Sequence, residues 1–181
     1  MAESLEQQLR ALVRDVPDFP KPGILFRDLT PVMRDPQAWK QVMEGMQQSL
    51  AGLQPEVIVG IEARGFIVGT SLAMTMGLGF VPVRKPGKLP GPITAVDYAL
   101  EYGSDRLEIQ EGALSGCQRV LVVDDLLATG GTCEAGIKLI ERLGGEVVGC
   151  VFIVDLPELG GRKRLEDMGM DVHALCAFEG A

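Results

Sequence analysis

The sequence predicts an α/β protein with a mainly parallel central sheet flanked by helices. Two observations predict this class. From residue 56 onward, short apolar runs alternate with amphipathic stretches of helical period, and glycines or prolines separate the two kinds of segment. Strands of a parallel sheet are buried on both faces, and the helices between them cover those faces. Because 181 residues is the size of one domain, we expect a single domain over residues 1–181.

Two helices are predicted in the amino-terminal part of the chain. Ser4 and Gln7 have the spacing of a capping box, and leucines follow on one helical face. The prolines of Pro17–Gly23 then keep the chain extended and irregular. Asp35 and Pro36 start the second helix, in which apolar residues recur at helical spacing.

Strands and helices alternate in the rest of the chain. Short apolar runs predict strands at Glu56–Ile61, Phe80–Arg84, Arg119–Val123, Glu146–Val154 and Val172–Phe178. Apolar periodicity predicts helices at Gly65–Met76 and Thr132–Leu143. Between them, Pro86–Pro92 is predicted to be flexible, and Tyr98–Tyr102 and Arg106–Gln110 are predicted to form a hairpin. Ligands of such sheets bind beyond the carboxyl ends of the strands, so the loops there are the places to look for a site.

Composition and charge exclude several classes of protein. A hydrophobic content of 46% with 23% charged residues is typical of a globular protein, and the longest apolar runs are too short to cross a membrane. A net charge of −8 argues against general binding of nucleic acid. Met1–Arg14 lacks the apolar centre of a signal peptide, so we expect a cytoplasmic protein. The four cysteines include no CxxC pair and are interpreted as small buried hydrophobes.

The most informative segment is Val120–Thr132, in which an apolar strand ends in two adjacent carboxylates, Asp124 and Asp125. The small-residue loop that follows opens a helix and consists of Ala128, Thr129, Gly130, Gly131 and Thr132. Backbone N–H groups and the dipole at such a helix start suit a phosphate, and the threonine hydroxyls add donors. Carboxylates beside a phosphate suit a ligand that also carries hydroxyls, because they bind hydroxyls through charge-assisted hydrogen bonds. The segment therefore predicts a site for a sugar phosphate.

Another loop follows the predicted strand that ends at Ile61. It consists of Glu62, Ala63 and Arg64 and should lie at the same end of the sheet. The guanidinium of Arg64 is a fixed positive fork that suits a diphosphate. An ion pair between arginine and glutamate on the surface is the alternative interpretation.

The longest loop concentrates positive charge in an otherwise acidic chain. Arg84, Lys85 and Lys88 lie on it beside several glycines and prolines. Such a cluster supplies the local positive field that a polyanion needs, and a flexible lid would exclude water from the site. Glu101 lies at the end of the same excursion and is a candidate general acid or base.

Val120–Thr132 resembles the signature with which type I phosphoribosyltransferases bind 5-phosphoribosyl-1-pyrophosphate (PRPP). The resemblance implies the type I phosphoribosyltransferase fold, with a small N-terminal hood at about residues 1–34, a core at about 35–181 and a flexible lid loop near 86–104. It implies that Asp124 and Asp125 hold the ribose hydroxyls and that Ala128–Thr132 cradle the 5′-phosphate. The pyrophosphate site that it implies consists of Glu62, Ala63, Arg64, Arg84, Lys85, Lys88 and Tyr102.

Pro17–Pro31 resembles the hood segment of the adenine phosphoribosyltransferases, whose relatives for other bases carry different sequences there. The resemblance implies that Leu25 and Arg27 present backbone groups to the edge of adenine, while Phe26 supplies an apolar face. Leu-Glu-Tyr at residues 100–102 resembles the catalytic-loop motif of the same family, which makes Glu101 the expected catalytic residue. The resemblance extends from about residue 17 to about residue 155.

The resemblance implies transfer of the 5-phosphoribosyl group from PRPP to adenine, giving AMP and pyrophosphate. It also implies a homodimer. Mg²⁺ is expected to enter with PRPP and to be held mainly by PRPP and water, with no direct protein ligand. Two alternatives stay open: an enzyme that accepts another purine, and a regulator that binds PRPP without catalysis.

Overall fold

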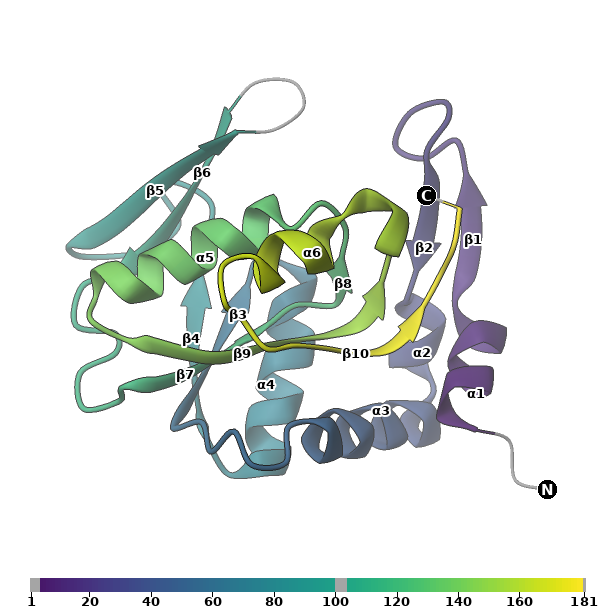
Figure 1. Ribbon diagram of the computed structural model, residues 1–181, viewed down its shortest axis with the longest axis horizontal. Helices are drawn as coiled ribbons and strands as arrows, with labels where there is room; N and C mark the ends of the chain where they lie inside the picture. The colour runs from purple at the N-terminus through teal and green to yellow at the C-terminus, as the bar shows by residue number, and fades with distance from the viewer. Residues whose placement is uncertain (1–3, 100–103, 181) are drawn as a thin grey trace.

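The protein is built around one parallel β-sheet (Figure 1). The computed structural model describes residues 4–99 and 104–180, and within these residues the sheet has six strands. Five of them lie in the order β10-β9-β7-β3-β4, and the short β8 pairs with β9. The strands are Val57–Ile61 (β3), Gly79–Val83 (β4), Arg119–Val123 (β7), Leu126–Leu127 (β8), Glu146–Asp155 (β9) and Val172–Ala177 (β10). Each pairing in the sheet is parallel, as predicted.

The described part of the chain has six α-helices, two of which begin with a side-chain cap. They are Leu5–Leu12 (α1), Thr30–Arg34 (α2), Pro36–Ser49 (α3), Arg64–Met76 (α4), Gly131–Arg142 (α5) and Gly161–Glu166 (α6), with a short 3-10 helix at Pro157–Leu159. The predicted capping box is present, because the hydroxyl of Ser4 accepts the N–H of Gln7 and the Gln7 side chain accepts the N–H of Ser4. Asp35 caps α3 by accepting the backbone N–H groups of Gln37 and Ala38. None of the helices in the described ranges is long and apolar enough to cross a membrane.

Helices cover both faces of the sheet. Alternate residues of each strand point to opposite sides, so each strand contributes apolar side chains to both faces. Ile58 and Leu121 face the core that α3 and α4 close. Val59 and Val122 face the second core, which contains the buried residues of α5 and of the β5–β6 hairpin. Strands that are apolar at nearly every position thus supply both cores, which confirms the predicted layers.

Two antiparallel hairpins extend the parallel sheet, and the sequence indicated them only in part. The first consists of Arg14–Pro17 (β1) and Leu25–Asp28 (β2) and lies within the segment predicted to be the N-terminal hood. It was missed because these strands are very short and the prolines between them favour irregular structure. The second consists of Ile93–Ala99 (β5) and Ser104–Gln110 (β6). Its first strand begins five residues before the predicted Tyr98. In Figure 1 both hairpins extend beyond the same end of the sheet.

Candidate active site

Loops from distant parts of the chain meet beyond the carboxyl ends of the central strands. Arg64 follows β3, Arg84 follows β4, and the acidic pair Asp124 and Asp125 follows β7. Side-chain contacts join these loops, because Arg64 forms an ion pair with Asp125 and Arg84 forms one with Glu62. The structure therefore brings together the predicted sugar-phosphate and diphosphate loops.

The acidic pair is fixed at the end of β7. Asp125 is only 3% exposed, and its backbone carbonyl accepts N–H groups from Ile153 and Val154 at 3.1 Å each. Its carboxylate accepts a hydrogen bond from Nε of Arg64, and its N–H donates to Oδ1 of Asp124 at 2.9 Å. Asp125 is thus a rigid acceptor, and it fixes the guanidinium of Arg64 beside it.

Asp124 lies against the start of α4, where only glycine leaves room for it. A Cβ added to Gly65 would lie 2.8 Å from Oδ1 of Asp124. Burial raises the pKa of Asp124 well above its usual range, and the charge of Asp125 raises it further, although Arg64 acts in the other direction. Asp124 therefore takes up a proton more readily than an ordinary aspartate, which reduces the repulsion between the acidic pair and an anion bound nearby.

The glycine loop forms a small hollow of about 90 Å³ beside the acidic pair. It is lined by Asp124, Leu126, Leu127, Ala128, Thr129, Gly130, Gly131, Thr132, Cys133 and Phe152. Gly130 has a φ of 77°, which favours glycine, and α5 begins at the next residue. The start of a helix therefore opens onto a hollow the size of a few water molecules, which suits a group as small as a phosphate.

The start of α6 packs against the glycine loop. A Cβ on Gly161 would lie 2.2 Å from the carbonyl oxygen of Ala128 and 2.9 Å from the nitrogen of Gly130. Arg164, one turn further along α6, forms an ion pair with Glu134 of α5 at 2.5 Å. The sequence did not indicate Gly161 as part of the site. The adjacent glycines were a weak signal, since the contact spans some thirty residues of sequence.

Each predicted pyrophosphate-binding cation of the lid is paired with a carboxylate. Glu62, with a side chain only 9% exposed, binds Arg84 at 3.3 Å, and it also binds Nζ of Lys88. The same carboxylate accepts the backbone N–H of Lys85 at 2.8 Å. The side chain of Lys85 instead pairs with Asp105 of the second hairpin. Glu62 therefore organises the basic loop, a role that its position in the sequence did not indicate.

Replacing Glu62 by glutamine should make the free energy of unfolding less dependent on pH below about pH 5. Burial by itself raises the pKa of Glu62, but hydrogen bonds from Lys88, Lys85 and Arg84 outweigh it and lower the pKa from 4.5 to about 2. Because the folded pKa lies below the unfolded one, this stabilisation is fully present above about pH 4.5 and is lost as the pH falls toward about 2.

Urea unfolding at a series of pH values measures this effect. Between about pH 5 and pH 2.5, the wild-type protein should lose on the order of 2 kcal/mol more free energy of unfolding than the Glu62→Gln variant. Equal losses in the two proteins would contradict the proposed network around Glu62.

The hood places an aromatic hollow next to the acidic pair. The guanidinium of Arg64 lies 5.2 Å from the ring centroid of Phe26, and the ring of Phe19 meets Phe26 edge-on at 5.1 Å. A hollow of about 480 Å³ is lined by Arg14, Val16, Phe19, Phe26, Asp28, Leu29, Thr30 and Arg64. Arg64 therefore contacts an aromatic ring of the hood and a carboxylate of the core at the same time.

Leu25 and Arg27 line a different hollow from Phe26, because consecutive residues of a strand point to opposite sides. Their hollow also contains Phe178 and Glu179 from the C-terminal segment. The side chains of Leu25 and Arg27 are thus separated from the Phe26 hollow. The prediction for these two residues concerns their backbone groups, and it stays a prediction.

Two predicted site residues, Glu101 and Tyr102, lie outside the described residues. Over 4–99 and 104–180, no group of three or more histidine, cysteine or acidic side chains is arranged to hold a metal ion. The expected role of Mg²⁺ therefore stays a prediction.

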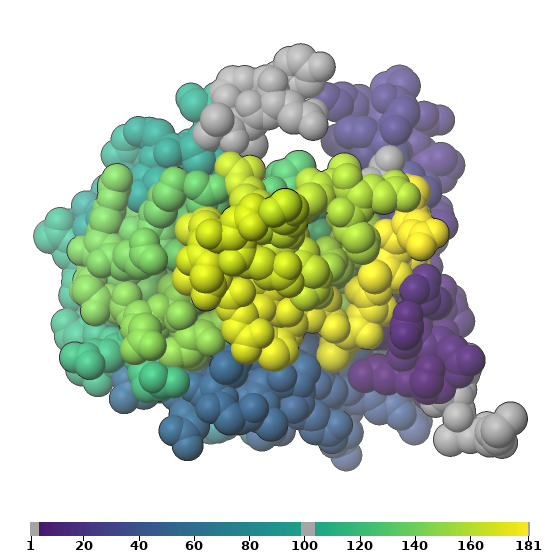
Figure 2. All heavy atoms as spheres, viewed as in Figure 1, coloured from purple at the N-terminus to yellow at the C-terminus, as the bar shows by residue number. Residues whose placement is uncertain are grey.

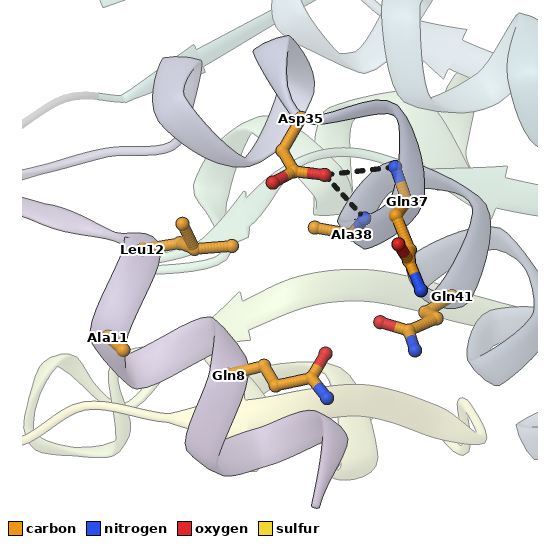
Figure 3. Close-up of a pocket in the computed structure, with 7 residues that line it drawn as sticks. All are labelled: Gln8, Ala11, Leu12, Asp35, Gln37, Ala38 and Gln41. Carbon is orange, nitrogen blue, oxygen red and sulfur yellow. Dashed lines mark hydrogen bonds between the residues drawn. The ribbon is translucent and has the colours of Figure 1, made fainter. Parts of the chain in front are cut away.

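A further hollow of about 340 Å³ lies between α1 and α3 (Figure 3). Gln8, Gln37 and Gln41 line it, together with Asp35. In Figure 3 the carboxylate of Asp35 reaches the backbone of the first turn of α3, where it serves as the helix cap. The polar group at this hollow is therefore used to hold the helix.

Comparison with known proteins agrees with this geometry. A family model described as the phosphoribosyl transferase domain matches residues 33–173, which is most of the chain. The fold and the paired loops at the carboxyl ends of the strands are thus those of the phosphoribosyltransferase class.

Individual relatives define the family more narrowly. The adenine phosphoribosyltransferase of Synechococcus sp. (strain RCC307) is 88% identical over 165 residues, covering 91% of this chain and 93% of that protein. A crystal structure of the enzyme from Thermoanaerobacter pseudethanolicus is 48% identical, has a TM-score of 0.92 and covers 97% of this chain and 100% of that chain. The Saccharomyces cerevisiae enzyme, 38% identical with a TM-score of 0.87 and coverages of 94% and 98%, was solved with adenine and an imino-altritol bisphosphate. The chain belongs to the adenine phosphoribosyltransferases, a family of pentosyltransferases, as the acidic pair and the hood segment predicted.

Proposed function

We propose that this chain transfers the 5-phosphoribosyl group from PRPP to adenine at the loop cluster described above, giving AMP and pyrophosphate. The observation that carries the proposal is the position of Arg64. Its guanidinium joins Asp125, beside the glycine-loop hollow, to Phe26, which lines the aromatic hollow of the hood. A sugar phosphate in one hollow and a flat base in the other would therefore lie side by side, as a transfer between them requires.

PRPP would occupy the core side of the site. Asp124 and Asp125 would accept hydrogen bonds from the ribose hydroxyls. The 5′-phosphate would enter the hollow at the start of α5 and bind the backbone N–H groups of Ala128–Thr132. The diphosphate would bind the loop of Glu62, Ala63 and Arg64. The lid would supply the remaining contacts to the diphosphate through Arg84, Lys85, Lys88 and Tyr102.

Adenine would enter from the hood. The ring of Phe26 supplies an apolar face of the size that a purine needs, and Phe19 supports that ring edge-on. The backbone groups of Leu25 and Arg27 would bind the polar edge of the base. That a yeast relative was solved with adenine supports this choice of base.

The reaction would proceed through an oxocarbenium-like transition state. The bond between the anomeric carbon and the diphosphate breaks, the ring oxygen shares the positive charge, and N9 of adenine attacks from the opposite face. Arg64, Lys85 and Lys88 would stabilise the negative charge of the leaving diphosphate, because preorganised charges act strongly at a closed site. Glu101 would hold or move a proton of the purine.

Mg²⁺ fits the same site as a companion of PRPP. The carboxylates of Asp124 and Asp125 are hard oxygen donors beside the phosphate hollow, which suits a hydrated magnesium ion. When bound, the ion would neutralise part of the diphosphate charge. A homodimeric assembly and a cytoplasmic location stay predictions from the family resemblance and the sequence.

A panel of bases tests the proposal. Product formation from PRPP and Mg²⁺ is measured with adenine, hypoxanthine, guanine and xanthine, for the wild-type chain and for Glu101→Ala. We expect AMP from adenine alone and a loss of activity of about a hundredfold or more in the variant. Turnover of another purine would overturn the assignment of the hood, and PRPP binding without turnover would indicate a regulator instead of an enzyme.

A further inference from the structure

The last described residues of the chain lie against the hood. In Figure 2 the yellow C-terminal segment meets the purple N-terminal segment, and in Figure 1 it continues from β10 past the base of β2. The core anchors this segment, because the N–H of Phe178 donates to the carbonyl of Asp155 at 3.0 Å and the N–H of Gly180 donates to Glu158 at 3.2 Å. The segment 177–180, called here the C-terminal strap, thus connects the core to the hood.

Arg27 of β2 joins the strap to β1 through the two terminal nitrogens of its guanidinium group. The side chain is 5% exposed and pairs through Nη1 with Asp15 of β1. Its Nη2 donates to the backbone carbonyls of Glu179, at 2.5 Å, and Gly180, at 2.9 Å. Its Cζ also lies 5.0 Å from the ring centroid of Phe178. A buried arginine with this many partners fixes the backbone on both sides of the contact.

A second hood arginine binds the same place. Arg10 of α1 donates from Nη2 to the carbonyl of Ala177 at 2.6 Å, and its Cζ lies 5.2 Å from the ring centroid of Phe178. Two guanidinium groups from different elements of the hood therefore meet one aromatic ring of the strap. Contacts between a guanidinium and an aromatic ring are favourable and become stronger when water is excluded.

The contacts of Arg27 with the strap and the aromatic hollow lie on opposite sides of β2. Arg27 follows Phe26 directly, and the two side chains point to opposite sides of β2. The strap holds one side of the strand, so the ring on the other side is held over Arg64. A shift of β2 by one ångström would move that ring relative to the base, and displacements of this size are costly in catalysis.

We propose that Arg27, through its side chain, and Phe178 are positioning residues for the base: they fix β2 to the C-terminal strap and thereby place Phe26 for binding adenine. The inference rests on the proposed function, because it names the devices that set the geometry of the same site. It assigns a role to a side chain that points away from the base. It also assigns one to a C-terminal residue that the motifs of the site do not include.

The test compares Arg27→Met and Phe178→Ala with a matched control, Arg119→Met. Arg119 likewise donates to two backbone carbonyls, those of Leu53 at 2.6 Å and Gln54 at 3.1 Å, but it does so at the start of β7, at the opposite end of the strand from the site. The control thus removes a similar pair of hydrogen bonds from an arginine to backbone carbonyls, at a place that does not contact the hood.

We expect both hood variants to raise the KM for adenine by about tenfold while the KM for PRPP stays within about twofold. Arg119→Met should leave both KM values unchanged, whatever it does to Tm. Phe178→Tyr, which keeps the ring, should have a KM for adenine close to the wild-type value. Arg27→Lys should not restore it, because lysine lacks the fork that reaches two carbonyls and an aromatic ring.

Other outcomes overturn the inference. An unchanged KM for adenine in folded Arg27→Met or Phe178→Ala would refute it, as would an equal rise in the KM for PRPP. If Arg27→Met does not fold, Phe178→Ala and Phe178→Tyr decide the question alone. A wild-type chain that does not turn over adenine would refute the proposed function, so the two failures are distinguishable.

Discussion

Replacing Arg64 by alanine should lower kcat/KM for AMP formation by roughly two to three orders of magnitude. Arg64 is the side chain that contacts both halves of the site. It forms an ion pair with Asp125 and lies over the ring of Phe26. Its loss would remove a positive charge from the leaving diphosphate and leave Asp125 buried without its cation. Steady-state kinetics with each substrate varied in turn measure the effect.

Arg64→Lys is the matched control for charge. Lysine keeps the positive charge but not the planar fork, so we expect it to recover only part of the lost activity. Circular dichroism and thermal unfolding establish that both variants fold. Activity within about threefold of the wild-type value in folded Arg64→Ala would contradict the central place given to this residue.

Gly161→Ala should raise the KM for PRPP by about tenfold to a hundredfold, although Gly161 need not touch the substrate. The added methyl group would lie 2.2 Å from the carbonyl oxygen of Ala128 and 2.9 Å from the nitrogen of Gly130, so the glycine loop must move. Both of these atoms belong to the backbone, and a flexible side chain cannot yield in their place. The dissociation constant from a titration with PRPP and the KM for PRPP measure the effect on PRPP binding.

Gly79→Ala is the matched control for this change. A Cβ on Gly79, at the start of β4, would meet Val57 at an ordinary 3.9 Å. We expect this variant to bind PRPP like the wild-type protein. A normal KM for PRPP in Gly161→Ala would show that α6 does not support the phosphate loop.

The parallel sheet was predictable from the sequence because each of its five longer strands carries its own signal. The two-residue β8 was not predicted, whereas Arg119–Val123 was predicted with the bounds that it has and the other four strands were predicted to within one residue at each end. These segments are apolar at nearly every position, and that pattern depends on burial of both faces. The hood strands β1 and β2 were not predicted, since each is short and is held by its partner and by side chains far away in the sequence.

The loops that meet at the candidate site were predictable where a motif is continuous in the chain. The acidic pair, the glycine loop and Arg64 each follow a strand, and the sheet brings them together. The partners of these residues were not predictable. Glu62 pairs with Arg84 and Lys88, and Gly161 packs against the glycine loop, through contacts that depend on three-dimensional packing. Local sequence carries no sign of such contacts.

Under the proposed function, the carboxylates that pair with Arg84, Lys85 and Lys88 would also decide which anions can compete for the site. Arg84 and Lys88 already share the carboxylate of Glu62, and Lys85 pairs with Asp105. An incoming anion must therefore displace an internal competitor. A simple monoanion gains too few contacts to do so, whereas a diphosphate can replace several carboxylate contacts at once. If the proposed diphosphate site is correct, Glu62 and Asp105 would thus act as a filter that favours multivalent phosphates over small anions.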